Sequence, residues 1–324
     1  MNSALVSPAQ QRRTGLGIAC GAGAGALWGL VFLAPALVGD FSPLQLTVAR
    51  YLAYGLIAAC LLAPRWDRIR QHIGRSEWLA LGQLGLIGNI AYYLLLSMAV
   101  QMGGVAMPSL VIGFLPVLVT IIGSRDSGAV PLRKLTLSLL LCIGGALAIG
   151  WQAFQVPASG SLGRQLASLA CAVGALVAWT SFAVTNSRWL VRLERVSVQD
   201  WNLLTGVVTG ALSVLFIPPM IFTGVGDHTG ADWARFAGVG IGLAVMASII
   251  GNGLWNQMSR LLPLTIVGQM ILFETLFALL YGFAWERRLP TTLEVVALAL
   301  VIGSVVTCLH AHRRGSDLAR DLVE

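Results

Sequence analysis

The stretch that decides the fold recurs faintly and without a gap: residues 112–151 read IGFLPVLVTIIGSRDSGAVPLRKLTLSLLLCIGGALAIGW, and residues 271–310 read ILFETLFALLYGFAWERRLPTTLEVVALALVIGSVVTCLH. Shifted by 159 positions, the two stretches share apolar, glycine and proline residues. The shared pairs are Ile112 and Ile271, Phe114 and Phe273, Gly123 and Gly282, Pro131 and Pro290, Leu141 and Leu300, Ile143 and Ile302, and Gly144 and Gly303. Because glycine and proline constrain the backbone, their recurrence carries more weight than that of apolar residues. The chain is predicted to contain two similar halves.

The composition places both halves in a membrane. Hydrophobic residues make up 56% of the chain and charged residues 11%, whereas soluble domains carry about 25% charged residues. Apolar stretches of about 20 residues can cross a bilayer as helices. We expect ten such helices, at about 16–38, 44–63, 78–100, 105–123, 132–152, 164–187, 198–221, 236–258, 263–283 and 291–311. The predicted fold class is therefore an all-α integral membrane protein, with no room for a soluble catalytic domain.

Further matches extend the repeat over most of the predicted helices. Trp28 corresponds to Trp179 at an offset of 151, and the triplet at 87–89 recurs at 250–252 as Ile-Gly-Asn. The other pairs, at an offset of 155, are Ser42 and Ser197, Gly55 and Gly210, and Pro64 and Pro219. Five spans are an odd number, so the second half is expected to be inverted relative to the first, as in transporters that bind substrate near the midplane. The predicted units are a tail at 1–15, a first repeat at 16–152, an external linker at 153–163, an inverted repeat at 164–311 and a tail at 312–324.

The net charge of +7 is explained by membrane topology. With ten spans, most arginines fall in the loops on the side of the N-terminus, and cytoplasmic loops are rich in Lys and Arg. We therefore expect a multi-pass protein of the plasma (inner) membrane with both termini in the cytoplasm. The expected partners are the lipid bilayer and a small-molecule substrate. No nucleic acid is expected, and the choice between a monomer and a homodimer stays open.

Small residues and prolines mark where the predicted helices pack or bend. Glycines recur at every fourth position of the first span, at Gly17, Gly21, Gly25 and Gly29. Such ladders let helix backbones approach closely in lipid; static packing and a sliding surface are both compatible with them. Pro108 and Pro116 predict a kink in the fourth span.

Several short motifs in order along the chain carry a family resemblance. They are Leu27-Trp28-Gly29, Ala49-Arg50-Tyr51, Phe114-Leu115-Pro116-Val117-Leu118 and Phe273-Glu274-Thr275-Leu276-Phe277. With them the chain resembles the ten-span, EamA-type family of the drug/metabolite transporter superfamily over about residues 16–311. A narrower likeness, to the aromatic amino acid exporter branch, rests on Val184-Thr185-Asn186, Leu203-Leu204-Thr205-Gly206 and Trp255-Asn256. One departure is Glu274-Thr275, where the family often has a proline.

Two ionisable residues are expected inside the membrane, where charge is costly and functional roles are common. Glu274 lies near the middle of the ninth span and is a candidate for proton coupling or for binding a substrate amine. A structural hydrogen bond to a neighbouring helix is the alternative. Arg50, in the second span, could hold a substrate carboxylate through a bidentate contact. It could equally extend to the outer headgroups or pair with Glu274 or Glu294.

Uncharged polar and aromatic residues complete the candidate substrate site. They are Trp28, Asn89, Tyr92, Tyr93, Ser109, Trp179, Thr180, Asn252, Trp255, Asn256 and Gln269. If Trp28, Tyr92 and Trp179 converge, their faces can stack on a planar apolar substrate. Each of these residues could instead serve helix packing, and Trp255 could belong to an interfacial aromatic belt.

The leading hypothesis is a secondary transporter that exports small metabolites by alternating access; the resemblance favours amino acids, aromatic ones above all. The alternatives are a multidrug or organic-solute exporter of the same superfamily, and a non-transporting scaffold or channel. An enzyme is not expected, because the sequence has no phosphate-binding loop and no G-x-S-x-G or H-E-x-x-H motif. No metal or cofactor is expected, and the five cysteines are interpreted as buried, unpaired thiols.

Overall fold

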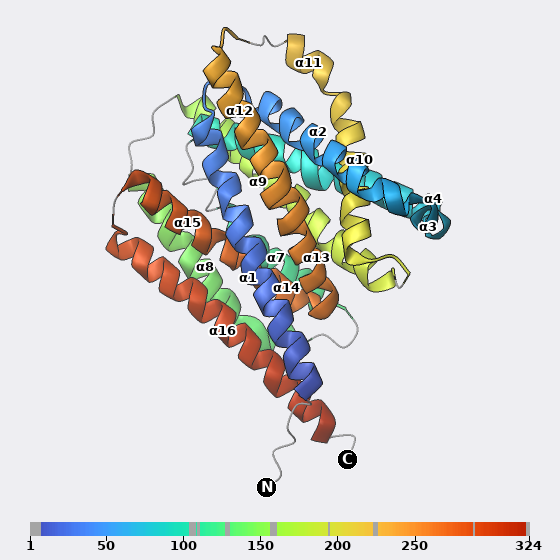
Figure 1. Ribbon diagram of the computed structural model, residues 1–324. Helices are drawn as coiled ribbons and strands as arrows, with labels where there is room; N and C mark the ends of the chain where they lie inside the picture. Colours follow the sequence, from blue (N-terminus) through green and yellow to red (C-terminus); the bar gives the residue numbers. More distant parts are fainter. Residues whose placement is uncertain are drawn as a thin grey trace.

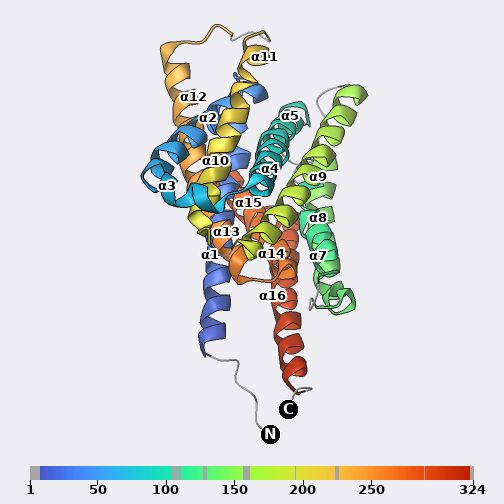
Figure 2. The ribbon, with the colours of Figure 1, turned by 90° about the vertical axis from the view of Figure 1, so that its right-hand side faces the viewer.

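The computed structural model describes residues 8–103, 108, 111–126, 130–155, 161–193, 195–222, 226–287 and 289–321. The described elements are all helices, packed side by side as a bundle (Figure 1). Both chain termini lie at one end of this bundle, and the start of α12 (Gly230–Leu243) lies at the other (Figure 2). The all-α fold class is therefore confirmed for the described part of the chain.

The helices follow the predicted spans closely, with several spans divided into shorter elements. The first part of the chain forms α1 (Pro8–Leu37), α2 (Pro43–Leu62), η1 (Ala63–Arg65), α3 (Trp66–Ile69), η2 (Arg70–His72), α4 (Arg75–Gln83), η3 (Leu84–Ala91), α5 (Tyr92–Gly103), α7 (Leu115–Gly123) and α8 (Leu132–Gln155). The second part forms α9 (Leu162–Arg192), α10 (Val198–Val214), α11 (Ile217–Phe222), α12, η4 (Ala244–Gly251), α13 (Asn252–Leu261), α14 (Leu264–Met270), α15 (Leu272–Glu286) and α16 (Thr292–Asp321).

Seven helical stretches of the described chain are long and apolar enough to cross a membrane. They are Arg12–Pro35, Pro43–His72, Arg75–Gly103, Leu162–Arg192, Gly230–Leu261, Leu264–Trp285 and Thr292–His312. These correspond to the first three, the sixth and the last three of the ten predicted spans. The remaining three fall on α7, on α8, and on α10 with α11. A protein with several membrane spans is confirmed, and the count of ten stays a prediction.

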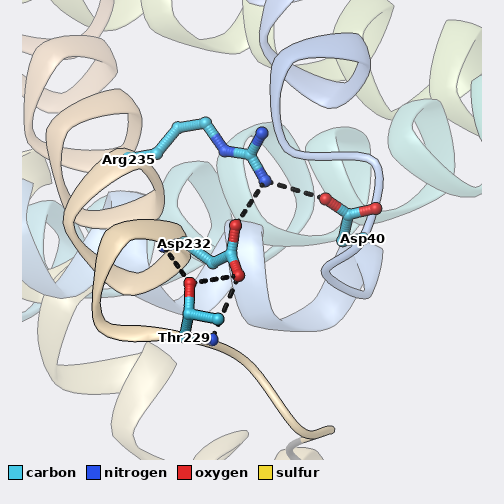
Figure 3. Close-up of polar contacts among 4 residues, drawn as sticks. All are labelled: Asp40, Thr229, Asp232 and Arg235. Atoms are coloured by element: carbon cyan, nitrogen blue, oxygen red, sulfur yellow. Dashed lines mark hydrogen bonds and ion pairs between the residues drawn. The ribbon is translucent and has the colours of Figure 1, made fainter.

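Hydroxyl side chains fix where several helices begin. Ser42 caps α2, accepting a hydrogen bond from the backbone N–H of Gln45 at 3.2 Å while the Gln45 side chain accepts one from the backbone of Ser42 at 2.7 Å. Ser197, its counterpart in the repeat, caps α10 by accepting from the N–H of Asp200 at 3.0 Å. Thr229 caps α12 in the same way (Figure 3). Such caps satisfy backbone donors that the first helical turn leaves unpaired.

Close helix pairs hold the bundle together: α2 packs on α10, α8 on α16, α1 on α15 and α5 on α9. The glycine ladder explains the third pair. A β-carbon on Gly25 would lie 2.6 Å from the β-carbon of Phe273, and one on Gly29 would lie 2.9 Å from the backbone nitrogen of Ala278. Gly25 and Gly29 therefore bring α1 against the backbone of α15, as small residues do at helix contacts in lipid, while Gly17 and Gly21 contact Leu262 and Met270.

Two of the predicted spans are broken in their middle. In the ninth span, α14 ends at Met270 and α15 begins at Leu272. In the fourth span, a turn at Gly113 and Phe114 precedes α7, which begins just before Pro116. The kink predicted from Pro116 is thus a short break immediately before it. The break in the ninth span places Glu274 in the first turn of a helix.

Candidate functional site

A small cavity lies where the broken ninth span meets the first, second, third, sixth and eighth spans. Its volume is about 20 Å³, which is enough for about one water molecule. It is lined by Trp28, Val31, Arg50, Tyr51, Gly88, Asn89, Tyr92, Trp179, Phe182, Asn252 and Glu274. This central cavity therefore combines aromatic rings, amides, a guanidinium and a carboxyl group, and it is closed to a metabolite in the conformation described here.

Aromatic rings pack around one side of the central cavity. Trp28 meets Trp179 edge to face at 5.2 Å between ring centroids, and Tyr92 meets Trp179 at 5.9 Å. The three rings whose convergence the sequence suggested thus lie together. Trp255 packs against two of these rings, with its ring centroid 4.9 Å from that of Trp28 and 5.3 Å from that of Trp179. Edge-to-face contacts of this kind fix ring orientation, as a stacking platform requires.

Trp28 is held in one orientation by hydrogen bonds to the eighth span. Its Nε1 donates to the carbonyl oxygen of Ala247 at 3.0 Å and to Oδ1 of Asn252 at 3.1 Å. Gly251 makes room for the indole, because a β-carbon there would lie 2.9 Å from Nε1. The glycine and asparagine of the repeated triplet at 250–252 therefore position an aromatic residue of the first span.

Two π-helical segments supply the backbone carbonyls used around the cavity. The segments η3 and η4 each contain the Ile-Gly step of the repeated triplet. A π-helix departs from the i→i−4 bonding of an α-helix and is frequent at functional sites. The Tyr51 hydroxyl donates to the carbonyl oxygen of Asn89 at 3.0 Å, and the Asn202 side chain donates to that of Ile249 at 2.9 Å. Apolar periodicity does not reveal such segments; the mid-span glycines were the available signal.

Arg50 is buried beside the cavity, with only 5% of its surface exposed. Its Nε donates to Oγ of Ser248 at 3.1 Å, and its guanidinium lies 4.4 Å from the ring centroid of Tyr93 and 5.1 Å from that of Tyr51. Among the described residues, Nη1 finds no hydrogen-bond acceptor. Arg50 therefore does not extend to the headgroups, and it retains an N–H donor for a further acceptor.

Glu274 contributes a carboxyl group to the same cavity and is also 5% exposed. It occupies the third position of α15, and its backbone N–H donates to the carbonyl oxygen of Ile271 at 2.9 Å. A β-carbon on Gly25 would lie 2.7 Å from its backbone nitrogen, so α1 passes directly beside it. Within the described part of the chain, no ion pair joins Glu274 to Arg50. The cavity thus holds a guanidinium group and a carboxyl group that make no direct ion pair.

The remaining candidate residues lie outside the cavity lining. Asn256 accepts a hydrogen bond from Asn186 at 2.7 Å, and Thr180 donates to the carbonyl oxygen of Leu176 within its own helix at 2.7 Å. Gln269 joins the ninth span to its neighbours, donating to Thr120 at 3.3 Å and accepting from Ser304 at 2.9 Å. Tyr93 and Trp255 pack directly behind the lining, and Ser109 lies outside the described residues.

Sequence reasoning missed four lining residues: Val31, Tyr51, Gly88 and Phe182. Tyr51 follows Arg50 in a motif that the sequence did single out, and Gly88 belongs to the repeated triplet. Phe182 packs into the space that Gly88 leaves, since a β-carbon on Gly88 would lie 2.3 Å from the Phe182 ring. Val31 and Phe182 carried no signal, because apolar residues in an apolar span look alike whether they face a cavity or a neighbouring helix.

The end of the bundle opposite the termini is tied by an ion-pair cluster. Arg235 on α12 contacts Asp40, in the loop between α1 and α2, at 2.8 Å and Asp232 at 3.1 Å (Figure 3). Nearby, the ring of Phe41 stacks on that of Phe236 with 4.2 Å between centroids. These contacts link the α1–α2 loop to the eighth span. In the described residues, no group of three or more His, Cys, Asp or Glu side chains is arranged to hold a metal ion.

A multispanning helical protein with a central polar and aromatic cavity is the class that this geometry defines, and comparison with known proteins gives its family. The profile of the EamA-like transporter family matches residues 15–151. Inner membrane protein YtfF of Escherichia coli strain K12 is 31% identical over 301 residues, which cover 89% of this chain and 93% of YtfF. The chain belongs to the EamA-like transporter family. A protein of known crystal structure, 20% identical, matches the fold with a TM-score of 0.68 over 92% of this chain and 98% of its own.

Proposed function

We propose that the protein is a secondary transporter of the inner membrane that exports amino acids, with aromatic ones favoured. The observation that carries this proposal is the central cavity, lined by the Arg50 guanidinium and the Glu274 carboxyl group with no direct ion pair between them among the described residues. An amino acid offers a carboxylate for Nη1 of Arg50, an ammonium group for Glu274 and a side chain for the rings around Trp28. Such placement satisfies groups that are otherwise costly to bury.

Reciprocal contacts between α8 and α16 support two inverted halves. A β-carbon on Gly144 would lie 3.5 Å from Leu300, and one on Gly303 would lie 3.5 Å from Leu141. Gly144 matches Gly303 in the repeat, and Leu141 matches Leu300. Each glycine thus contacts the leucine of the opposite half, and the two contacts are equivalent in the repeat. Such reciprocal contacts are typical of an interface on a two-fold axis. The first and second halves are therefore proposed to be related by such an axis.

The contact between α2 and α10 repeats this arrangement. A β-carbon on Gly55 would lie 3.2 Å from the carbonyl oxygen of Gly206, and one on Gly210 would lie 3.1 Å from that of Tyr51. At the offset of 155, Gly55 matches Gly210 and Tyr51 matches Gly206, so the two contacts exchange under the same operation. Inverted repeats of this kind expose a midplane site alternately to the two sides of a membrane. With ten spans, both termini would be cytoplasmic, on the side of the arginine-rich loops.

Alternating access also fits the size of the central cavity. A volume of about 20 Å³ excludes an amino acid, so the helices around it must separate on one side before a substrate can enter. The broken fourth and ninth spans provide breaks at which half-helices can move. Transport by this route uses gradients or exchange, because the sequence has no nucleotide-binding loop.

Counterflow of radiolabelled phenylalanine into proteoliposomes tests the proposal, with amino acids and bulky organic cations as competitors. We expect saturable counterflow in the wild-type protein and its loss in both Arg50→Lys and Arg50→Ala, because a lysine cannot reproduce a bidentate guanidinium contact. Arg68→Ala, at an exposed arginine between α2 and α4, is the matched control. Competition by cations but by no amino acid would favour the organic-solute exporter, and unsaturable ion current would favour a channel.

A further inference from the structure

A second and much larger hollow lies towards the end of the bundle that carries both termini. Its volume is about 330 Å³, which approaches the size of small-molecule sites. We call it the inner vestibule; it is lined by Asp126, Ser187, Arg188, Val191, Arg192, Leu262, Pro263 and Leu264. These residues come from the segment after α7, from the last turns of α9 and from the loop between α13 and α14.

The inner vestibule lies close to the central cavity along α9. Phe182 lines the central cavity and Arg188 lines the vestibule; six residues of helix separate them, or about 9 Å along the axis. The contact of α7 with α14 closes the bundle beside it. A β-carbon on Gly123 would lie 3.1 Å from Leu264, and one on Gly268 would lie 3.0 Å from Thr120. Separation of these two half-helices would open a path from the vestibule towards the central cavity.

The charges of the inner vestibule leave one cation in excess. Arg188 pairs with Asp126 at 2.8 Å, and both side chains remain accessible, at 46% and 39% exposure. Arg192 is exposed, with its guanidinium 5.9 Å from the ring centroid of Trp189. The nearby Arg260, by contrast, donates to three backbone carbonyl oxygens and lies outside the lining. Two guanidinium groups thus face one carboxylate in a concave surface.

We infer that the inner vestibule is an entry site that captures the carboxylate of a solute before it reaches the central cavity. The inference rests on the proposed export function, since it places the vestibule on the cytoplasmic side. The carboxylate binds Arg192 and competes with Asp126 for Arg188, because Arg–carboxylate contacts are strong and geometrically matched. Displacing Asp126 removes the ion pair that joins the segment after α7 to α9, and α7 is the half-helix that contacts α14. Capture of the solute is thereby linked to the contact that closes the path.

An anionic phospholipid carries the same chemistry and is the competing source of an anion. Val191, which lines the vestibule, is 68% exposed on the outer surface of α9, and basic pockets between helices on the cytoplasmic side can hold lipid headgroups. The experiment must therefore separate a dissolved carboxylate from a lipid phosphate.

Titration of 4-fluorobenzoate, followed by fluorine NMR, provides this test with the full chain in phosphatidylcholine nanodiscs. It is repeated in Arg50→Ala protein, so that binding at the central cavity is separated from binding at the vestibule. We expect saturable binding that weakens about tenfold in Arg192→Gln and in Arg188→Gln, the effect of losing one charge-assisted hydrogen bond. Asp126→Asn should strengthen binding because it removes the competing carboxylate. The controls are Arg195→Gln, at an exposed arginine outside the lining, and neutral 4-fluorobenzamide, which should not bind.

Three outcomes would overturn the entry site. Equal affinity in Arg192→Gln and wild-type protein would show that the arginines do not hold the carboxylate. Loss of fluorobenzoate binding when phosphatidylglycerol is incorporated in the nanodiscs would assign the vestibule to a lipid. If 4-fluorobenzoate still binds but phenylalanine counterflow fails, the proposed export of amino acids is rejected and the vestibule site is not. If the KM for phenylalanine counterflow is unchanged in Arg192→Gln, the entry site is rejected and the proposed export of amino acids is not.

Discussion

The Cα atom of Gly210 lies 2.6 Å from the position that a β-carbon on Gly55 would occupy, so the backbones of α2 and α10 touch where they cross. The two glycines occupy equivalent positions in the two halves of the sequence. If the halves are related by the proposed two-fold axis, a crossing at which a residue meets its own counterpart lies on that axis. The crossing would then stay in place while the two halves rotate about it.

Gly55→Ala should lower the stability of the folded protein. The added methyl group cannot fit at 2.6 Å, so α2 and α10 must move apart, and overpacking of this kind costs about 1–3 kcal/mol. We expect a lower melting temperature in detergent for Gly55→Ala and for Gly210→Ala. Gly82→Ala is the matched control, because a β-carbon there meets nothing within 4 Å. Equal melting temperatures for Gly55→Ala and Gly82→Ala would contradict the crossing geometry.

Trp28→Phe and Trp255→Phe should differ although the two rings are neighbours. Trp28→Phe removes the donor to the Ala247 carbonyl oxygen and to Oδ1 of Asn252. The carbonyl oxygen keeps the backbone N–H of Asn252, but a buried side-chain acceptor that loses its donor costs about 1–3 kcal/mol. The Nε1 of Trp255 has no acceptor among the described residues, so its removal should have a smaller effect. Chemical denaturation of both variants in the same detergent measures the difference. A larger loss in Trp255→Phe would argue against the hydrogen-bonding role of Trp28.

The sequence predicted the membrane helices and their glycine contacts better than it predicted the lining of the cavity. The apolar spans and the glycine contacts were predictable, because bilayer thickness fixes helix length and close backbone approach requires glycine. Gly25 and Gly55 carried that signal directly. The π-helical segments and the positions of Val31 and Phe182 in the cavity lining could not be predicted, because no pattern of polar and apolar residues marks them. Asn256 and Gln269 were drawn into the candidate site because an amide in an apolar span looks the same whether it binds a solute or a neighbouring helix.

Cysteine labelling should test the orientation of the two halves. In a cysteine-free background, Asp67→Cys and Asp227→Cys each place a thiol at an exposed position between membrane helices. With the N-terminus in the cytoplasm, residue 67 follows the second span and lies inside, while residue 227 follows the seventh span and lies outside. A membrane-impermeant maleimide applied to spheroplasts should therefore label Asp227→Cys and should label Asp67→Cys only after lysis. The reverse labelling pattern would show that the protein has the opposite orientation in the membrane.

Glu274→Gln should separate substrate binding from energy coupling. The glutamine keeps the size of the side chain and one oxygen acceptor, but it replaces the other oxygen by an NH2 donor and cannot carry a proton between the two sides of the membrane. Because this carboxylate is proposed to hold the substrate ammonium group, phenylalanine counterflow should weaken in Glu274→Gln; if Glu274 also couples transport to protons, accumulation driven by an imposed pH gradient should be lost. Glu77→Gln, at an exposed carboxylate that caps α4, should keep both activities. An undiminished response of Glu274→Gln to the gradient would exclude proton coupling through this residue. Undiminished counterflow in Glu274→Gln would show that the carboxylate does not hold the ammonium group of the substrate.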